Sequence, residues 1–145
     1  MKMEKHPLIP KKIVVIEESR LICSILERRF RKTGYSVFVS RKGKEGFAKV
    51  KELQPDLVVL DLMLPDMPGE EICREIKRNE RLHHIPVIIL SAKADEADRI
   101  VARVIGADVF LTKPVDMEKL LAEVKSLLSR PQHLKIYLEK HPSSR

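Results

Sequence analysis

The chain has 145 residues, of which 43% are hydrophobic and 34% charged, a balance typical of a single globular domain. No apolar run approaches the roughly 20 residues that span a bilayer, and residues 1–7 lack the apolar stretch of a signal peptide, so a cytoplasmic protein is expected. The net charge of +7 comes mostly from residues 1–12 and 130–145, and with only 4% aromatic residues it favours solvated tails over a nucleic-acid surface.

Apolar runs and helical patterns alternate from residue 13 onward. Residues 13–16 form a short, continuous apolar run that predicts a buried strand. A helix is predicted after it, with Ser19 as its N-cap and Gly34 at its end. The side chains expected on one face of this helix are Leu21, Ile22, Ile25, Leu26 and Phe30.

The middle of the chain repeats this alternation. Residues 35–39 and 56–60 are the predicted second and third strands, and Pro55 ends the helix between them. Apolar side chains at helical spacing mark the second and third helices: Phe47, Val50 and Leu53, then Ile72, Cys73 and Ile76.

The last third contains two further strand and helix pairs. Pro86 opens a strand that ends at Leu90, and residues 107–112 form the fifth strand. Gly106 ends the fourth helix, and Asp116 is the expected N-cap of the fifth. The apolar residues that mark these two helices are Ile100, Val101, Val104 and Ile105, then Leu120, Leu121, Val124, Leu127 and Leu128.

Five strands that alternate with five helices predict an α/β fold, a doubly wound five-stranded parallel sheet with helices on two faces. The strand order 2-1-3-4-5 is expected because it makes the first and third strands neighbours. One domain is predicted over residues 12–129, with a basic extension at 1–11 and a basic tail at 130–145. Cys23 and Cys73 fall on helices of opposite faces, so two buried free thiols are expected.

Polar side chains follow four of the predicted strands at the point where each strand ends. They are Glu17 and Glu18 after the first strand, Asp61 after the third, Ser91 after the fourth and Lys113 after the fifth. The carboxyl ends of parallel strands meet at one edge of the sheet, where open α/β folds place their chemistry. Each residue alone is more often a cap, a turn former or a surface charge, but their joint placement predicts a functional site.

Three carboxylates at one edge repel each other, so a hard divalent cation is the expected compensation. Mg2+ takes oxygen ligands, one or two of them carboxylates, and keeps waters or phosphate oxygens in its other positions. A carboxylate beside Mg2+ can attack phosphorus and form an aspartyl phosphate. In that chemistry Asp61 is the nucleophile, Lys113 neutralises charge on the phosphoryl group, and Ser91 donates a hydrogen bond to it.

Four longer segments combine the predicted strands with the polar residues that follow them. They are Ile-Val-Val-Ile-Glu-Glu-Ser at 13–19, Asp-Leu-Val-Val-Leu-Asp-Leu-Met-Leu-Pro-Asp-Met-Pro-Gly at 56–69, Pro-Val-Ile-Ile-Leu-Ser-Ala at 86–92 and Gly-Ala-Asp-Val-Phe-Leu-Thr-Lys-Pro at 106–114. With these segments the chain resembles the response-regulator receiver domain of two-component signalling. Together they are highly specific, and the resemblance covers about residues 12–129.

The resemblance implies roles for the residues at the sheet edge. Asp61 would accept a phosphoryl group from a phosphohistidine on a sensor histidine kinase or a histidine phosphotransfer protein. The metal ligands would be Glu17, Glu18, Asp61 and the carbonyl oxygen of Met63, and the phosphoryl group would be read by Ser91 and Lys113. Such a protein is a signalling phosphoacceptor in a phosphorelay, which catalyses only its own phosphorylation and slow dephosphorylation.

The resemblance also implies a switch and an output surface. Phe110 stands where the family places a switch aromatic, on a surface formed by the fourth helix, the fifth strand and the fifth helix. That surface would contact an effector that the sequence does not identify, or form a homodimer. The family's peptide bond before Pro114 is usually cis, and proline lowers the free-energy penalty of that isomer.

Glu18 departs from the family pattern, which normally has aspartate there. The extra methylene carries the carboxylate about 1.5 Å further, and Mg2+ tolerates distorted coordination poorly. Two interpretations therefore stay open: a phosphorylated receiver, and a pseudo-receiver that acts as a protein-interaction module without phosphorylation. In the family, residues at the positions of Met63 and Lys93 influence how fast the phosphoryl group is lost.

Overall fold

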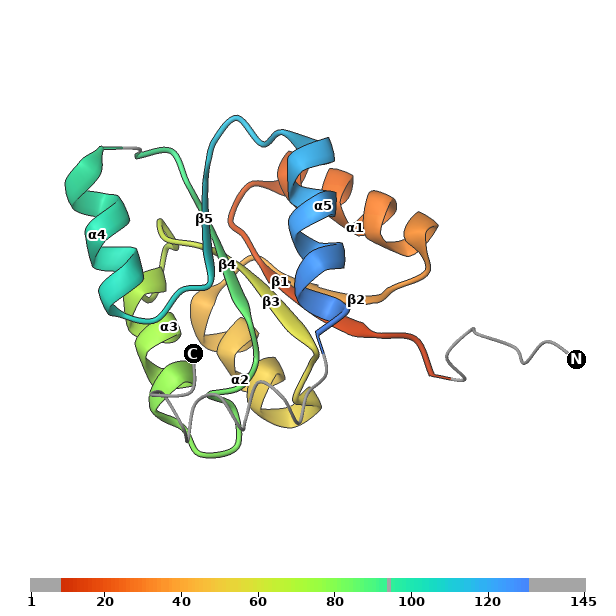
Figure 1. The fold of residues 1–145 in the computed structure, drawn as a ribbon, viewed down its shortest axis with the longest axis horizontal. Coiled ribbons are helices and arrows are strands. Elements are labelled where there is room, and N and C mark those ends of the chain that lie inside the picture. The colour runs from red at the N-terminus through yellow and green to blue at the C-terminus, as the bar shows by residue number, and fades with distance from the viewer. Residues whose placement is uncertain (1–8, 94, 131–145) are drawn as a thin grey trace, which may run out of the picture.

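The computed structural model describes residues 9–93 and 95–130, which form a sheet between two layers of helices (Figure 1). The strands are β1 (Lys12–Ile16), β2 (Ser36–Ser40), β3 (Leu57–Asp61), β4 (Val87–Ser91) and β5 (Val109–Thr112). The helices are α1 (Arg20–Thr33), α2 (Gly43–Leu53), α3 (Gly69–Arg78), α4 (Glu96–Val104) and α5 (Met117–Leu128). The predicted alternation is confirmed. The extension at 1–11 and the tail at 130–145 lie almost wholly outside the described residues, so these boundaries stay predictions.

The sheet is parallel throughout and has the predicted strand order, β2-β1-β3-β4-β5. Every residue of β3 and β4 is buried, as expected for interior strands that helices cover on both faces. The edge strands β2 and β5 are only partly buried. Because β1 lies beside β3, the loops that follow these two strands are neighbours at the carboxyl edge of the sheet.

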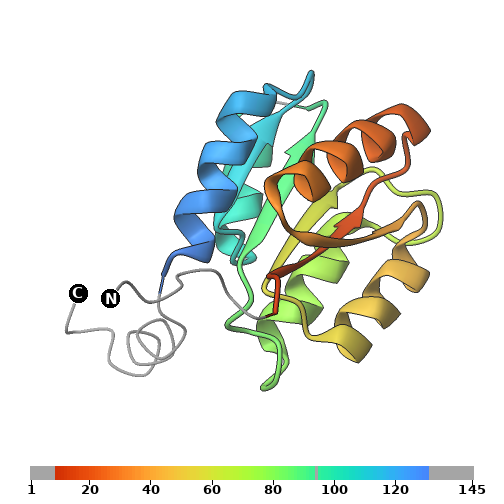
Figure 2. The ribbon, with the colours of Figure 1, turned by 90° about the vertical axis from the view of Figure 1, so that its right-hand side faces the viewer.

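The helices cover the two faces of the sheet unequally. α2, α3 and α4 pack on one face and α1 and α5 on the other, an arrangement that Figures 1 and 2 show from two sides. Val50, Ile72 and Ile76 contribute to the first layer, and Phe30 and Leu120 to the second. The predicted caps Ser19 and Asp116 are confirmed, since each side chain accepts a hydrogen bond from the first turn of its helix.

Both cysteines are buried free thiols, as predicted. Cys73 belongs to the core under α3, whereas Cys23 lies on α1, on the other face of the sheet. Burial raises the pKa of each thiol to about 11. The Sγ atom of Cys23 donates a hydrogen bond to the backbone carbonyl of Glu17 at 2.9 Å, so this thiol helps to fix the start of the loop after β1.

The buried side of α1 differs from the predicted one. Cys23, Leu26 and Phe30 are buried, whereas Leu21 and Ile25 are 69% and 41% exposed. The apolar stripe on this helix is wider than its contact with the sheet: the row at positions i, i+3 and i+7 is buried and Ile22 packs beside it, partly buried. The prediction was therefore wrong for Leu21 and Ile25.

Most apolar residues of α4 are exposed as well. The helix packs against the core through Ala102, with Ile105 at its C-cap. Ile100, Val101 and Val104 face outward, and Val104 is 78% exposed. Helical spacing marks these residues as one helix but does not show which of them meet the sheet.

Gly46 lies where α2 crosses β1, and a Cβ atom there would be 2.6–2.8 Å from three side-chain atoms of Ile16. We expect Gly46→Ala to lower the free energy of unfolding by about 1–3 kcal/mol, because overpacking outweighs the better helix propensity of alanine. Urea denaturation of both proteins measures this difference. Adding Ile16→Val, which removes one crowding methyl group, should recover part of the loss. A Gly46→Ala variant as stable as the wild type would contradict the close approach.

Candidate functional site

The loops that follow β1, β3, β4 and β5 lie at one edge of the sheet, toward the top of Figure 1. The strand register keeps their ends level, since Leu60 pairs with Ile16 and Ser91 with Thr112. The polar residues that follow the strands therefore meet at this edge, as the alternation of strands and helices predicts.

The ammonium group of Lys113 lies between two buried carboxylates. Its Nζ atom donates a hydrogen bond to Glu17 Oε2 at 3.1 Å, and it lies 3.1 Å from Glu17 Oε1 and 3.4 Å from Asp61 Oδ2. Glu17 is fully buried and Asp61 is only 3% exposed. When both carboxyls are ionised, one positive charge faces two negative ones in surroundings poor in water. The cluster therefore attracts a further cation.

The surroundings of Glu17 disfavour its ionised form. Burial raises its pKa above the ordinary carboxyl value and Asp61 adds to the rise, while the N–H of Ser19 and the charge of Lys113 oppose it. Its Oε2 atom accepts a hydrogen bond from the Ser19 N–H at 2.9 Å. Its Oε1 atom is buried and has no hydrogen bond within the described part of the chain, although Lys113 lies at ion-pair distance. That oxygen can accept a further ligand.

Asp61 is held by the backbone of the β3–α3 loop, residues 62–68. Its Oδ1 atom accepts a hydrogen bond from the Met63 N–H at 3.1 Å, which leaves Oδ2 toward Lys113. The loop closes where the Gly69 N–H donates to the Leu62 carbonyl at 2.9 Å. A Cβ atom on Gly69 would overlap the backbone carbonyl of Asp61, so α3 can begin this close to the site only with glycine.

Ser91 ends β4 beside the same edge and is buried. Its Oγ atom accepts a hydrogen bond from the Lys93 N–H at 3.1 Å, and its carbonyl accepts one from the Lys113 N–H at 2.8 Å. These bonds tie the loop after β4 to the end of β5. The Lys113–Pro114 peptide bond is cis, as the resemblance implies.

Glu18 lies apart from the buried pair of carboxylates. It is exposed, and it lines an open cavity of about 620 Å³ together with Met63, Asp66 and Glu70 and with apolar residues of the β3–α3 loop. Within residues 9–93 and 95–130, no three acidic, histidine or cysteine side chains are grouped so that they could hold a metal ion. The role of Glu18 as a direct metal ligand therefore stays a prediction.

Two residues that the sequence did not single out join the loops around the site. Arg41, after β2, donates from Nε to the Glu18 carbonyl at 2.8 Å. Asp66, in the β3–α3 loop, accepts hydrogen bonds from the N–H groups of Gly43 at 2.7 Å and Lys44 at 3.0 Å. The pattern of strands and helices contains no signal for such contacts, because each joins segments more than 20 residues apart.

Phe110 lies in β5 and is half-buried, so one side of its ring packs on the core beneath α4. The guanidinium of Arg99, on α4, stands over the ring at 5.1 Å from its centroid. Both residues line a cavity of about 240 Å³ that reaches Thr112 and Asp116. The predicted switch residue thus lies between α4 and the loop that carries Lys113.

The residues at the edge fit a magnesium ion in part. Glu17 and Asp61 supply two carboxylates, one with a buried oxygen that lacks a hydrogen bond, and Mg2+ commonly takes one or two carboxylates with waters in its remaining positions. The charge of the cluster also favours a cation. A third carboxylate ligand is not in place, because Glu18 is exposed and lies apart from the pair.

The sequence of residues 13–125 matches the family model described as the response regulator receiver domain. The chain belongs to the response-regulator receiver family. The match covers the sheet and nearly all of the helices described above, including every residue of the cluster around Lys113.

Several solved receiver domains share the fold. The receiver domain of a signal transduction histidine kinase from Syntrophus aciditrophicus is 34% identical, covers 82% of this chain and 90% of its own, and has a TM-score of 0.76. A Francisella response regulator receiver domain is 28% identical, covers 83% of this chain and 98% of its own, and has a TM-score of 0.77. The BeF3-activated receiver domain of Klebsiella pneumoniae RstA is 25% identical, covers 82% of this chain and 99% of its own, and has a TM-score of 0.75.

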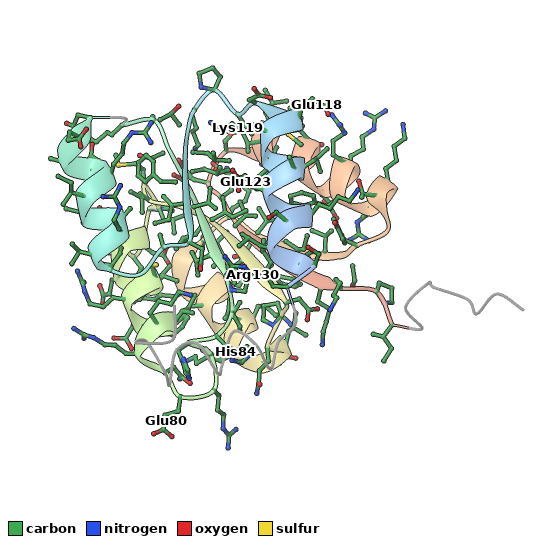
Figure 3. All side chains as sticks on the ribbon, in the orientation of Figure 1. Glu80, His84, Glu118, Lys119, Glu123 and Arg130 are labelled. Carbon is green, nitrogen blue, oxygen red and sulfur yellow. The ribbon has the colours of Figure 1, made fainter. Side chains whose placement is uncertain are left out.

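The histidine pair before β4 lies away from the site. His83 and His84 precede β4, and their rings stand edge to face with centroids 6.1 Å apart. Figure 3 shows His84 at the end of the molecule opposite the β5–α5 loop. This pair is therefore remote from Asp61.

In the described ranges, no helix is long and apolar enough to cross a membrane.

Removing the Lys113 charge should destabilise the protein, because two buried carboxylates would then face each other without a cation. We expect Lys113→Met to lower the free energy of unfolding in metal-free buffer by about 2 kcal/mol, less than for a fully buried pair because Lys113 is partly exposed. Lys119→Met, at an exposed lysine labelled on α5 in Figure 3, is the matched control and should have little effect. Urea denaturation compares the three proteins, and equal losses in both variants would contradict the electrostatic account.

Proposed function

We propose that this chain is a phosphoacceptor response regulator, in which Asp61 takes a phosphoryl group from a phosphohistidine of a sensor histidine kinase or a histidine phosphotransfer protein. The observation that carries the proposal is the buried pair of Glu17 and Asp61 held by the single ammonium of Lys113. Membership of the receiver family supports it. We place the protein in the cytoplasm, in keeping with its two free thiols.

The transfer is a displacement at phosphorus. The Met63 N–H occupies Oδ1 of Asp61, so we assign Oδ2 as the attacking oxygen. The new O–P bond forms as the N–P bond breaks, and the electron pair of that bond stays on the imidazole of the donor. Lys113, already 3.4 Å from Oδ2, would then contact a phosphoryl oxygen, and Ser91 would donate a hydrogen bond to another.

Mg2+, when bound, would neutralise negative charge on the phosphoryl oxygens and on Asp61. Glu17, Asp61 and the Met63 carbonyl are the residues that we assign to hold it, with Glu18 as a further contributor. Glu17 has a separate task, because it keeps Lys113 beside Asp61 before the donor arrives. The protein would therefore catalyse no reaction beyond its own phosphorylation and dephosphorylation.

The output surface in this proposal is formed by α4, β5 and α5. Ile100, Val101 and Val104 give α4 an exposed apolar face, which is typical of a protein contact. Phe110 is the switch residue, and the Lys113 N–H bond to Ser91 joins its strand to the loop after β4. An effector or a second copy of the chain would bind this surface. The receiver domain of RstA is described as BeF3-activated, which supports a distinct activated state.

The competing proposal is a pseudo-receiver that binds its partners without phosphorylation. The position of Glu18 favours it, because this carboxylate is exposed and no three metal-binding side chains are grouped in the described residues. The two proposals differ in one measurable property, which is whether Asp61 becomes phosphorylated.

Mass spectrometry of the intact chain after treatment with a small phosphodonor and MgCl2 separates the two proposals. We expect one added phosphoryl group on the wild type and none on Asp61→Asn, because an amide nitrogen cannot replace the attacking oxygen. Circular dichroism should show the same fold in both. Label on another residue of Asp61→Asn, or no label on the wild type, would remove Asp61 as the acceptor.

Met63 should prolong the lifetime of the phosphoryl group. Met63 is 57% exposed and lines the open cavity beside the β3–α3 loop, two residues beyond Asp61. A thioether side chain cannot orient a water molecule, and we expect this one to occupy space through which water would approach phosphorus. We expect Met63→Asn to speed the loss of phosphate several-fold after the phosphodonor is removed. Met63→Leu, of similar size and polarity, is the control and should decay like the wild type. Equal or slower decay in Met63→Asn would show that Met63 does not shield the phosphoryl group.

A further inference from the structure

The β2–α2 turn, taken as residues 41–44 so that it includes the first two residues of α2, contacts both loops that carry the proposed metal ligands, although it supplies no ligand of its own. On one side Arg41 donates from Nε to the carbonyl of Glu18 at 2.8 Å. On the other side the N–H groups of Gly43 and Lys44 donate to the two carboxylate oxygens of Asp66 at 2.7 and 3.0 Å. The turn thus spans the site from the β1–α1 loop to the β3–α3 loop.

The Asp66 contact replaces a cap that α2 lacks. The N-cap residue Lys42 makes no side-chain hydrogen bond to the helix, so the first N–H groups of α2 need acceptors from elsewhere. Asp66 provides both acceptors and places its negative charge at the positive end of the helix dipole. The backbone bonds from Lys44 and Gly43 hold the pKa of Asp66 below its ordinary value.

Gly43 makes the close approach possible. It is buried, and a Cβ atom there would lie 3.0 Å from Met67 Cβ and 3.1 Å from Ile72 Cδ1. The start of α2 is therefore packed directly against the β3–α3 loop. This packing and the Asp66 bonds together fix the loop that carries the backbone groups of Met63.

The turn is itself held in one conformation. The Oγ atom of Ser40, a buried residue, donates to Glu45 Oε1 at 2.8 Å and accepts from the Lys42 N–H at 3.2 Å. The Glu17 N–H donates to the Ser40 carbonyl at 3.0 Å, which fixes β1 against the end of β2. A rigid turn with contacts on both sides can set the distance between the two loops.

We propose that Arg41 and Asp66 are positioning residues for the cation site, because they brace the β1–α1 loop against the β3–α3 loop. The brace sets how far the carboxylates of Glu17 and Glu18 lie from Asp61 and the Met63 carbonyl. This inference rests on the proposed magnesium site. It predicts that removal of the Arg41 side chain weakens Mg2+ binding, whereas the loss of its positive charge alone would strengthen it.

Titration calorimetry of the full chain with MgCl2 tests the brace, because charge and geometry predict opposite signs. Arg41→Met removes a positive charge near the site, which by electrostatics alone tightens binding of a divalent cation. Loss of the bond to Glu18 should instead weaken Mg2+ binding about fivefold, the size expected for one hydrogen bond. Lys42→Met removes the same charge from the same turn and keeps the Arg41 bond, so it should bind Mg2+ as tightly as the wild type or more tightly.

Asp66 offers a second comparison in the same experiment. Asp66→Asn and Asp66→Ala both remove the charge, but asparagine keeps one acceptor for the start of α2. The brace predicts weaker Mg2+ binding in Asp66→Ala than in Asp66→Asn, whereas charge alone predicts equal binding. Thermal melts of both variants confirm that the fold is kept at the temperature of the titration.

The outcomes separate the brace from the proposed function. Asp61→Asn should bind Mg2+ much more weakly than the wild type, which shows that the cation is at the site. If the wild type does not bind Mg2+, or if Asp61→Asn binds it equally well, both the magnesium site and the brace are overturned. If binding depends on Asp61 but Arg41→Met is as tight as Lys42→Met, the brace alone is overturned.

Discussion

The structure depends on a charge imbalance at the carboxyl edge of the sheet. Lys113 faces Glu17 and Asp61, both buried, and a single ammonium cannot balance two ionised carboxylates. Such a group is unfavourable for stability unless further positive charge is supplied. The rest of the site is arranged around this imbalance. The Met63 N–H donates to one oxygen of Asp61, and both the Ser19 N–H and Lys113 donate to one oxygen of Glu17. The other oxygen of each carboxylate lies at ion-pair distance from Lys113.

The fold brings these residues together from segments far apart in sequence. Glu17 and Lys113 are separated by 96 positions, yet the parallel strands end at the same edge, with β3 between β1 and β4. Glycine makes two of the close approaches possible, at Gly69 where α3 begins and at Gly43 where α2 meets the β3–α3 loop. The β3–α3 loop is thus held by close contacts with α2 and α3, while the Lys113 N–H bond to the Ser91 carbonyl joins the end of β4 to the segment that carries Lys113.

Much of the fold, and the edge of the sheet where the site lies, could be predicted from sequence because both depend on short-range patterns. Apolar runs located the strands, Ser19 and Asp116 marked helix starts, and polar residues at the strand ends located the edge. The exposed faces of α1 and α4 could not be predicted, since helical spacing at Leu21 or Val104 does not show how wide the contact with the sheet is. The positions of Arg41, Asp66 and Glu18 depend on how loops meet, which no local pattern records.

The most direct test of the charge imbalance is the shift in Tm on addition of about 10 mM MgCl2, measured for the wild type and for Glu17→Gln. The wild type should be stabilised, because a cation that binds the native state alone shifts the unfolding equilibrium toward it. In Glu17→Gln one carboxylate faces one ammonium, so the imbalance is gone and the shift should be nearly abolished. Equal shifts in both proteins, or no shift in the wild type, would contradict the account.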